Sequence, residues 1–175
     1  MFTAKTERRS VRDKGTKRIA LMGLLFALAM VLSYLESLIP SIGMPGIKLG
    51  LSNVVTMYCL FFIGPMPAII LALLKSGFVF LMGKGAVAVL LSAAGGLCSV
   101  LVMAGLAKLK ASKGATSIAG AVAHNIAQLA VAAWIIGMPV MVFYLPALVI
   151  SGVVMGLITA LILKYVTPAF SRFNT

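Results

Sequence analysis

The sequence predicts an all-α membrane protein: a bundle of six transmembrane helices with both termini in the cytoplasm. Of its 175 residues, 62% are hydrophobic and only 10% are charged, and the mean hydropathy is +1.14. Soluble domains carry about 25% charged residues, so the surface of this chain is suited to lipid rather than to water. Turn-forming residues divide the apolar sequence into six segments, and the length fits one bundle.

Three apolar segments lie in the first half of the chain. Pro40 and Pro45 follow the first segment, and the dipeptide Gly64-Pro65 separates the second from the third. A membrane helix needs about 20 residues at about 1.5 Å each, so the second segment is short for a full crossing. The tight break at Gly64-Pro65 predicts a close hairpin of the second and third helices. We place the three helices at residues 19–39, 49–63 and 65–82.

Three further segments lie in the second half. They are separated by Gly83-Lys84-Gly85, by residues 108–114 and by Gly137-Pro139. We place these helices at residues 86–107, 116–137 and 141–164. The predicted domains are a basic cytoplasmic tail (1–18), a transmembrane domain (19–165) and a cytoplasmic C-terminal tail (166–175).

The basic residues predict the orientation. Seven of the 15 lysines and arginines occur in the first 18 positions, and the 108–114 segment holds three more. If the N-terminus is inside, the outer loops contain only Lys48 and Lys84. Most basic residues then lie on the cytoplasmic side, as is usual for membrane proteins. A basic tail next to a membrane span indicates contact with anionic lipid rather than with nucleic acid.

Several kinds of chemistry find no support in the residues. Cys59 and Cys98 both lie in apolar segments and form no Cys-x-x-Cys pair, so we expect no disulfide framework and no thiolate metal site. No Gly-x-x-x-x-Gly-Lys-Ser/Thr loop is present, so a transport process driven by ATP would need another chain to hydrolyse it. We predict no cofactor and no metal.

Polar residues inside membrane spans are costly and usually face the bundle interior or a cavity. Lys75 lies ten residues after Pro65 and therefore about 15 Å deep. His124 and Gln128 are four residues apart and share one face of the fifth helix. The predicted substrate-binding residues are Lys48, Asn53, Lys75, Gln128 and Glu36.

Structural roles are the alternatives for these groups. Glu36 either faces water at the outer surface or pairs with Lys48 or Lys75. His124 and Asn125 either face a ligand or bond the backbone across helices. Lys75 has the furthest to reach for water, which favours a paired or ligand-facing role.

The stretch Pro45-Gly46-Ile47-Lys48-Leu49-Gly50-Leu51-Ser52-Asn53, with Phe62-Ile63-Gly64-Pro65, resembles the Gx transporter family, whose members are often labelled heptaprenyl diphosphate synthase component I. More broadly, the chain is similar over about residues 17–165 to the substrate-binding membrane subunits (S-components) of energy-coupling factor (ECF) transporters. The resemblance implies a six-helix fold with a ligand pocket near the outer face, in the cell membrane of a prokaryote.

The resemblance also implies partners. Small residues on the first helix of S-components dock a transmembrane coupling subunit, which is driven by two cytoplasmic ATPases. Gly23 and Ala27 match that small-xxx-small motif, with Gly in place of the more usual Ala. The alternative use of such spacing is close packing within the bundle.

Two functions are therefore expected. The first is a substrate-binding subunit for uptake of a small anionic or amphipathic molecule, with isoprenoid or quinone precursors among the candidates. The alternative is a non-catalytic accessory or anchoring subunit for a prenyl diphosphate synthase or redox system. We do not expect an enzyme, because magnesium sites for diphosphates need clustered carboxylates and the chain has only Glu7, Asp13 and Glu36.

Overall fold

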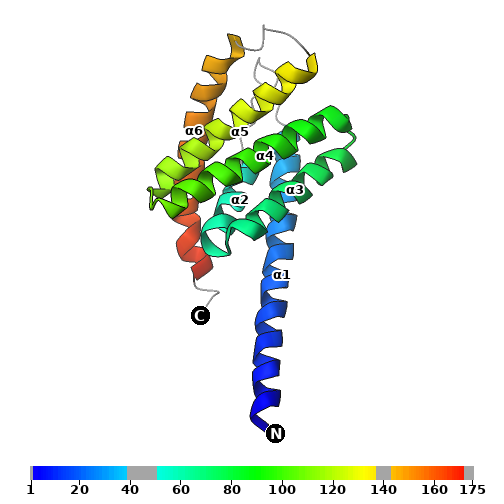
Figure 1. Cartoon of the computed structure of the whole chain (residues 1–175), viewed down its shortest axis with the longest axis vertical. Coiled ribbons are helices and arrows are strands. Elements are labelled where there is room, and N and C mark those ends of the chain that lie inside the picture. The colour runs from blue at the N-terminus through cyan, green and yellow to red at the C-terminus, as the bar shows by residue number, and fades with distance from the viewer. Residues whose placement is uncertain (1, 39–50, 137–142, 172–175) are drawn as a thin grey trace.

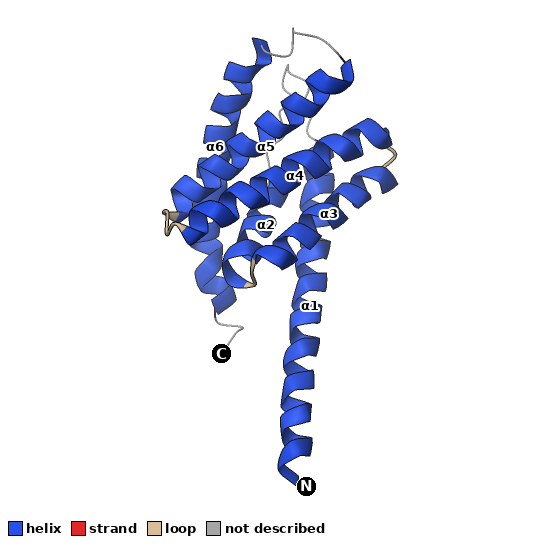
Figure 2. Ribbon diagram, viewed as in Figure 1, coloured by secondary structure: helices blue, strands red, loops and turns tan. Residues whose placement is uncertain are grey.

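A computed structural model describes residues 2–38, 51–136 and 143–171, and in these ranges the chain is a bundle of helices joined by short turns (Figures 1 and 2). The four middle helices fall within three residues of their predicted bounds. The helices in the described ranges are α1 (Phe2–Leu38), α2 (Leu51–Phe62), α3 (Pro65–Leu81), α4 (Gly85–Lys108), α5 (Lys113–Ile136) and α6 (Leu145–Ser171).

The first helix differs most from its predicted bounds. Residues 2–18, assigned above to a basic tail, are helical and continuous with the first apolar segment. Figure 1 shows this part of α1 projecting away from the other helices. Hydropathy finds apolar segments and gives no signal for a charged helix, which is why the sequence placed the start of the helix at residue 19. α6 also extends past its predicted end at residue 164, to Ser171.

The α2–α3 turn is built by the Gly64-Pro65 pair. The amides of Ile63 and Gly64 both donate to the carbonyl of Cys59 at 2.9 Å, which ends α2. Gly64 has φ 135°, a backbone conformation that residues other than glycine rarely adopt. Pro65 then begins α3 at a position where its missing N–H is not needed. The two helices are therefore joined as the predicted close hairpin.

Small residues allow the second half of the bundle to pack closely. The most extensive contacts are those of α4 with α5 and of α5 with α6. A Cβ added at Gly156 of α6 would lie 2.5 Å from the Cα of Ile118 on α5, and one at Gly152 would lie 3.0 Å from the Cα of Val122. Only glycine permits this approach of the two backbones. Ser117 adds a hydrogen bond across the same contact, donating from Oγ to the carbonyl of Gly156 at 2.8 Å.

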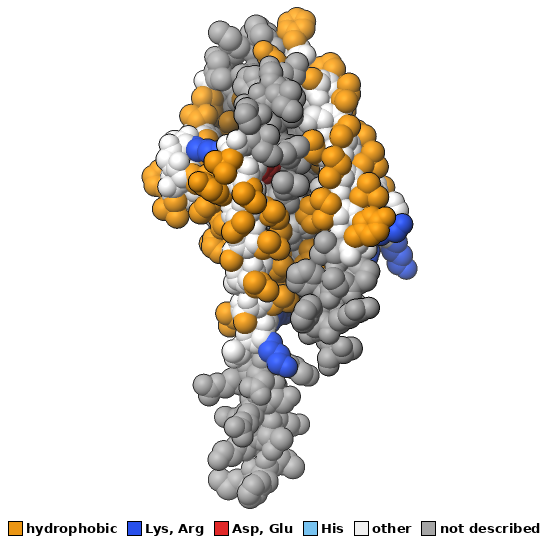
Figure 3. Space-filling model, turned by 180° about the vertical axis from the view of Figure 1, so that it is seen from behind, with side chains coloured by type: hydrophobic (Ala, Val, Ile, Leu, Met, Phe, Trp, Pro, Cys, Tyr) orange, Lys and Arg blue, Asp and Glu red, His pale blue; other side chains and the backbone are white. Residues whose placement is uncertain are grey.

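The surface of the described residues is suited to lipid. Figure 3 shows hydrophobic side chains over most of the coloured surface, with few charges. Four helical segments are long and apolar enough to cross a membrane, within α1, α4, α5 and α6. With 12 and 17 residues, α2 and α3 are shorter, so the prediction of a short second helix is confirmed. The chain is a helical membrane protein.

Candidate functional site

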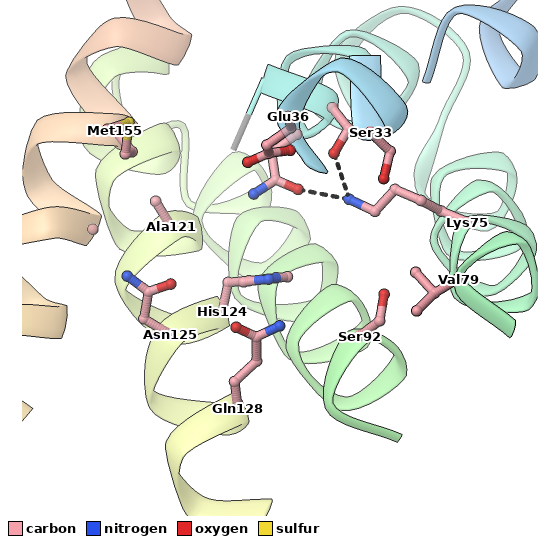
Figure 4. A pocket seen from close by; sticks show the side chains of 13 residues that line it. Ser33, Glu36, Lys75, Val79, Ser92, Ala121, His124, Asn125, Gln128 and Met155 are labelled. Atoms are coloured by element: carbon pink, nitrogen blue, oxygen red, sulfur yellow. Dashed lines mark hydrogen bonds between the residues drawn. The ribbon is translucent and has the colours of Figure 1, made fainter. Parts of the chain in front are cut away.

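A polar cavity lies inside the bundle, and each of the six helices contributes to its wall. Apolar membrane bundles rarely gather polar side chains without a functional reason, because each must be satisfied away from water. Figure 4 shows the side chains converging from the surrounding helices. The polar side chains are Ser33, Glu36, Ser52, Asn53, Lys75, Ser92, His124, Asn125 and Gln128.

Lys75 of α3 is the most informative residue of the cavity wall. Its side chain is only 6% exposed, although it carries a charge. The ammonium donates to Asn53 Oδ1 at 2.9 Å and to Ser52 Oγ at 3.1 Å (Figure 4). Both acceptors belong to the first turn of α2. A buried ammonium needs such acceptors, so these contacts hold the charge at the cavity.

The opposite wall is formed by α5. His124 and Gln128 both lie over Gly95 of α4, where an added Cβ would be 2.8 Å from His124 Cε1 and from Gln128 Cγ. The two side chains therefore share a face of α5, as the spacing predicts. Figure 4 shows them entering the cavity from the side facing Lys75. Gly95 leaves the room that both side chains occupy.

Other polar side chains connect the helices around the cavity. Asn125 donates from Nδ2 to the carbonyl of Leu148 on α6 at 2.8 Å. Ser76 bonds the carbonyl of Ala72 at 3.0 Å and approaches the hydroxyl of Ser92 on α4 at 3.3 Å. Asn125 thus bonds backbone across helices and lines the cavity at the same time, so the structural and ligand-facing alternatives are compatible for this residue.

The size of the cavity limits what it can hold. About 40 Å³ is open to the centre of a water-sized sphere. A single water needs roughly 10–15 Å³ by the same measure, so there is room for a few waters or one small polar group. Complete small-molecule sites measure roughly 300–1,000 Å³. In this conformation the cavity can enclose the polar group of a ligand but not a whole drug-sized molecule.

The cavity wall contains hydrogen-bond donors and acceptors, and it has one basic and one acidic side chain, Lys75 and Glu36. Lys75 and the side-chain amides can donate to an anionic or carbonyl oxygen, while Glu36 can accept from a hydroxyl or amine. Among the described residues no three His, Cys, Asp or Glu side chains lie close enough together to hold a metal. The arrangement is suited to binding a polar group by hydrogen bonds and charge.

Four of the five predicted substrate-binding residues line this one cavity: Glu36, Asn53, Lys75 and Gln128. Lys48 lies outside the described residues. The sequence did not single out Ser33, Ser52 and Ser92, because serine is common in membrane helices and can bond its own backbone. For Ser52, the one available signal was its position next to Asn53.

Gly23 and Ala27 lie apart from the cavity, on an exposed face of α1. Nothing lies within 4 Å of a Cβ added at Gly23. Leu24 and Val31 beside them are more than half exposed. Within the described residues this face packs against no other helix, so close packing inside the bundle does not explain the small residues.

Comparison with known proteins supports one assignment. No curated protein and no solved structure matches the chain. A family model described as heptaprenyl diphosphate synthase component I matches residues 25–166, which include all of α2, α3, α4 and α5, most of α6 and the C-terminal part of α1. With a match over most of its length, the chain belongs to the heptaprenyl diphosphate synthase component I family.

Proposed function

We propose that the chain is the substrate-binding membrane subunit of an uptake transporter of the energy-coupling factor type. The observation that carries this proposal is the polar cavity enclosed by all six helices, with the buried ammonium of Lys75 at its wall. Polar side chains in a membrane bundle are expensive, and a protein that served only as an anchor would have no use for nine of them around one space.

The cavity supports a ligand with an anionic or strongly polar group. Lys75 lines the cavity and is oriented by two acceptors on α2, so its positive charge lies beside an oxygen bound there. Because the space fits one small polar group, the remainder of an amphipathic substrate would extend beyond it. A small carboxylate or phosphate, or an isoprenoid or quinone precursor with such a group, meets both conditions.

The test is to identify small molecules that remain with the purified chain, using mass spectrometry of an organic extract. The native chain and Lys84→Met, which changes an exposed lysine of the α3–α4 turn, should retain the same molecule. Lys75→Met, which keeps the length of the side chain but removes the charge, should not. Gln128→Leu, on the opposite wall, should also lose it. Equal retention by all four proteins would show that the cavity is not the substrate site.

The exposed small residues of α1 support a coupling subunit as the partner. The open space over Gly23 and the exposed Ala27 would admit the close approach of a helix from another chain. We expect Gly23→Ile together with Ala27→Ile to abolish co-purification of a membrane coupling subunit and its two ATPases. Val87→Ile, at an exposed position of α4, is the control and should not affect it.

A second candidate function is a non-catalytic accessory subunit that holds a prenyl diphosphate synthase at the membrane. Two observations favour it: the family's description as component I of a synthase, and the helical basic extension of α1 beyond the bundle. Affinity purification separates the two functions. Capture of a soluble synthase that is lost on deletion of residues 2–14, without ATPases, would establish the accessory role. Capture of a coupling subunit and ATPases would establish transport.

A further inference from the structure

A second cavity lies at the other end of α5 and is independent of the polar one. It is a groove between the first turn of α5 and the last turns of α6, with about 490 Å³ open to the centre of a water-sized sphere. This is more than ten times the space in the polar cavity. Its wall is almost entirely hydrocarbon from α6, with one lysine on each helix: Leu157, Ala160, Leu161, Leu163, Lys113 and Lys164.

The groove has an apolar length and a cationic end. Leu157, Ala160, Leu161 and Lys164 follow the three- and four-residue spacing of a single helix face. Leu157 and Leu161 are about half exposed, so an adjacent hydrocarbon chain can cover them. Lys164 lies on the same face, about two turns after Leu157 and one turn after Leu161. A molecule lying along α6 would therefore contact leucine side chains over most of its length and the Lys164 ammonium at one end.

Lys113 supplies the second positive charge of the groove, and the N-terminal amides of α5 add partial positive charge beside it. Its Nζ lies 5.3 Å from the ring centroid of Phe62 and 5.9 Å from that of Phe61, which holds the ammonium near the end of α2. Lys113 is also the first residue of α5, where amide groups have no acceptor within the helix. Gly114 lines the groove, and nothing lies within 4 Å of a Cβ built there. The start of α5 is thus a positive, accessible end.

This end of the bundle is positive overall. Arg18 of α1 donates to the carbonyl of Ile63 in the α2–α3 turn at 3.3 Å, which adds a positive charge near the same end. Glu36 lies in the other cavity, and no carboxylate lines the groove in the described part of the chain. A negative group entering here meets two lysines and no like charge.

We propose that the groove binds an anionic phospholipid of the surrounding bilayer. The phosphate of the headgroup lies between Lys113 and Lys164, and one acyl chain covers Leu157 and Leu161 on α6. Basic pockets between membrane helices on the positive side are suited to anionic headgroups. Charge complementarity selects the headgroup, and the apolar length of the groove requires a hydrocarbon chain rather than a free ion.

The test measures lipid contact at the groove by fluorescence quenching. The chain has a single tryptophan, Trp134, which lies 82% exposed near the other end of α5. In a Trp134→Phe background, Leu157→Trp places the only tryptophan at the groove. The protein is reconstituted in phosphatidylcholine nanodiscs with rising fractions of brominated phosphatidylglycerol or brominated phosphatidylcholine. A lysine close to anionic lipid strengthens binding about fivefold, so two lysines predict a preference of about 25-fold for phosphatidylglycerol.

Matched variants test whether Lys113 and Lys164 cause the preference for phosphatidylglycerol. Lys113→Gln with Lys164→Gln should bring the two lipids to equal quenching, and each single change should remove about fivefold. The control, Lys108→Gln with Lys110→Gln, removes two exposed charges, one at the end of α4 and one in the α4–α5 turn, outside the groove, and should keep the preference. Leu161→Trp in place of Leu157→Trp provides a second reporter that should give the same result.

Several results would overturn the proposal. Equal quenching by the two lipids in the parent protein would exclude selection of an anionic headgroup. An equal loss in the Lys108/Lys110 control would assign the preference to general surface charge. Release of the brominated lipid by millimolar inorganic phosphate would identify an ion site without a role for the acyl chain.

Discussion

At the scale of single residues, the contacts of Lys75 join two helices. Ser52 and Asn53 are consecutive in the first turn of α2, and both accept from the ammonium on α3. The charge would be costly in an apolar bundle without them. The same two contacts fix how far α2 can slide along α3. The residue that makes the site polar therefore also determines the position of its neighbours.

Asn53→Ala should destabilise the protein by about 1–3 kcal/mol, because it leaves a buried, charged donor without the 2.9 Å acceptor. The measurement is unfolding in mixed detergent–SDS micelles followed by circular dichroism. The same change in a Lys75→Met background should cost much less, because the ammonium is already absent. An equal cost in both backgrounds would mean that Asn53 stabilises α2 independently of Lys75.

The cost of polar residues in lipid made part of the site predictable. Lys75, Asn53, Glu36 and Gln128 could be selected from the sequence because each is unusual in an apolar segment. Their convergence could not be read from it, since it depends on how six helices rotate about their axes. The serines were missed for a chemical reason: a hydroxyl can bond the carbonyl four residues earlier, as Ser76 does with Ala72, so a serine in a span does not by itself indicate a partner on another helix.

At the scale of elements, glycine performs two different tasks in the second half of the bundle. Gly156 lies against the backbone of α5, where Ile118 cannot move without moving its helix. Gly95 lies instead beneath the side chains of His124 and Gln128, which can rotate away. The first glycine determines the distance between α5 and α6, and the second determines the shape of the cavity.

Alanine substitutions should separate these tasks. Gly156→Ala should destabilise the fold by about 1–3 kcal/mol, because the added methyl overlaps backbone atoms. Gly95→Ala should change stability less but abolish retention of the cavity ligand, because His124 and Gln128 must move. The control is Gly105→Ala, where nothing lies within 4 Å of the added carbon. The readouts are SDS unfolding and mass spectrometry of the bound molecule. Similar effects of Gly156→Ala and Gly95→Ala on both readouts would contradict this division.

The sequence predicted the elements best where turn chemistry is strong. Gly64-Pro65 and Gly83-Lys84-Gly85 located both ends of α3 to within one residue. The start of α5 was placed three residues late, because Lys113 and Gly114 carry no helix signal although Ser112 caps the helix, accepting from the amide of Ala115 at 3.2 Å. The apolar pattern predicts which part of a helix is surrounded by lipid. It does not predict the residue at which the helical hydrogen bonds begin.

At the scale of the whole molecule, the short α2 explains why the cavity is polar. Arg18 and Lys113 lie near the C-terminal end of α2, which places that end close to a membrane surface. Twelve residues extend only about 18 Å, while the hydrocarbon layer is about 30 Å thick. Ser52 and Asn53, at the N-terminal end of the described part of α2, therefore lie inside the layer. Both side chains accept there from the Lys75 ammonium.

The predicted orientation is testable by cysteine labelling in intact cells. Cys59 and Cys98 are first replaced by alanine, and single cysteines are then introduced as Lys84→Cys or Lys110→Cys. Both positions lie in exposed turns. A membrane-impermeant maleimide should label position 84 from outside and position 110 only after permeabilisation, because the predicted orientation puts the positive end in the cytoplasm. Labelling of both positions from the same side would contradict six crossings.

The uninterrupted length of α1 has a mechanical consequence. Its 37 residues span about 55 Å, which leaves about 25 Å of helix beyond a hydrocarbon layer of about 30 Å. A protein bound to the distal turns would be held at a set distance and a set angle from the bundle. Each inserted residue would rotate those turns by about 100° and advance them by about 1.5 Å. Recognition there would then depend on helical phase, and would return only when the insertion approaches whole turns.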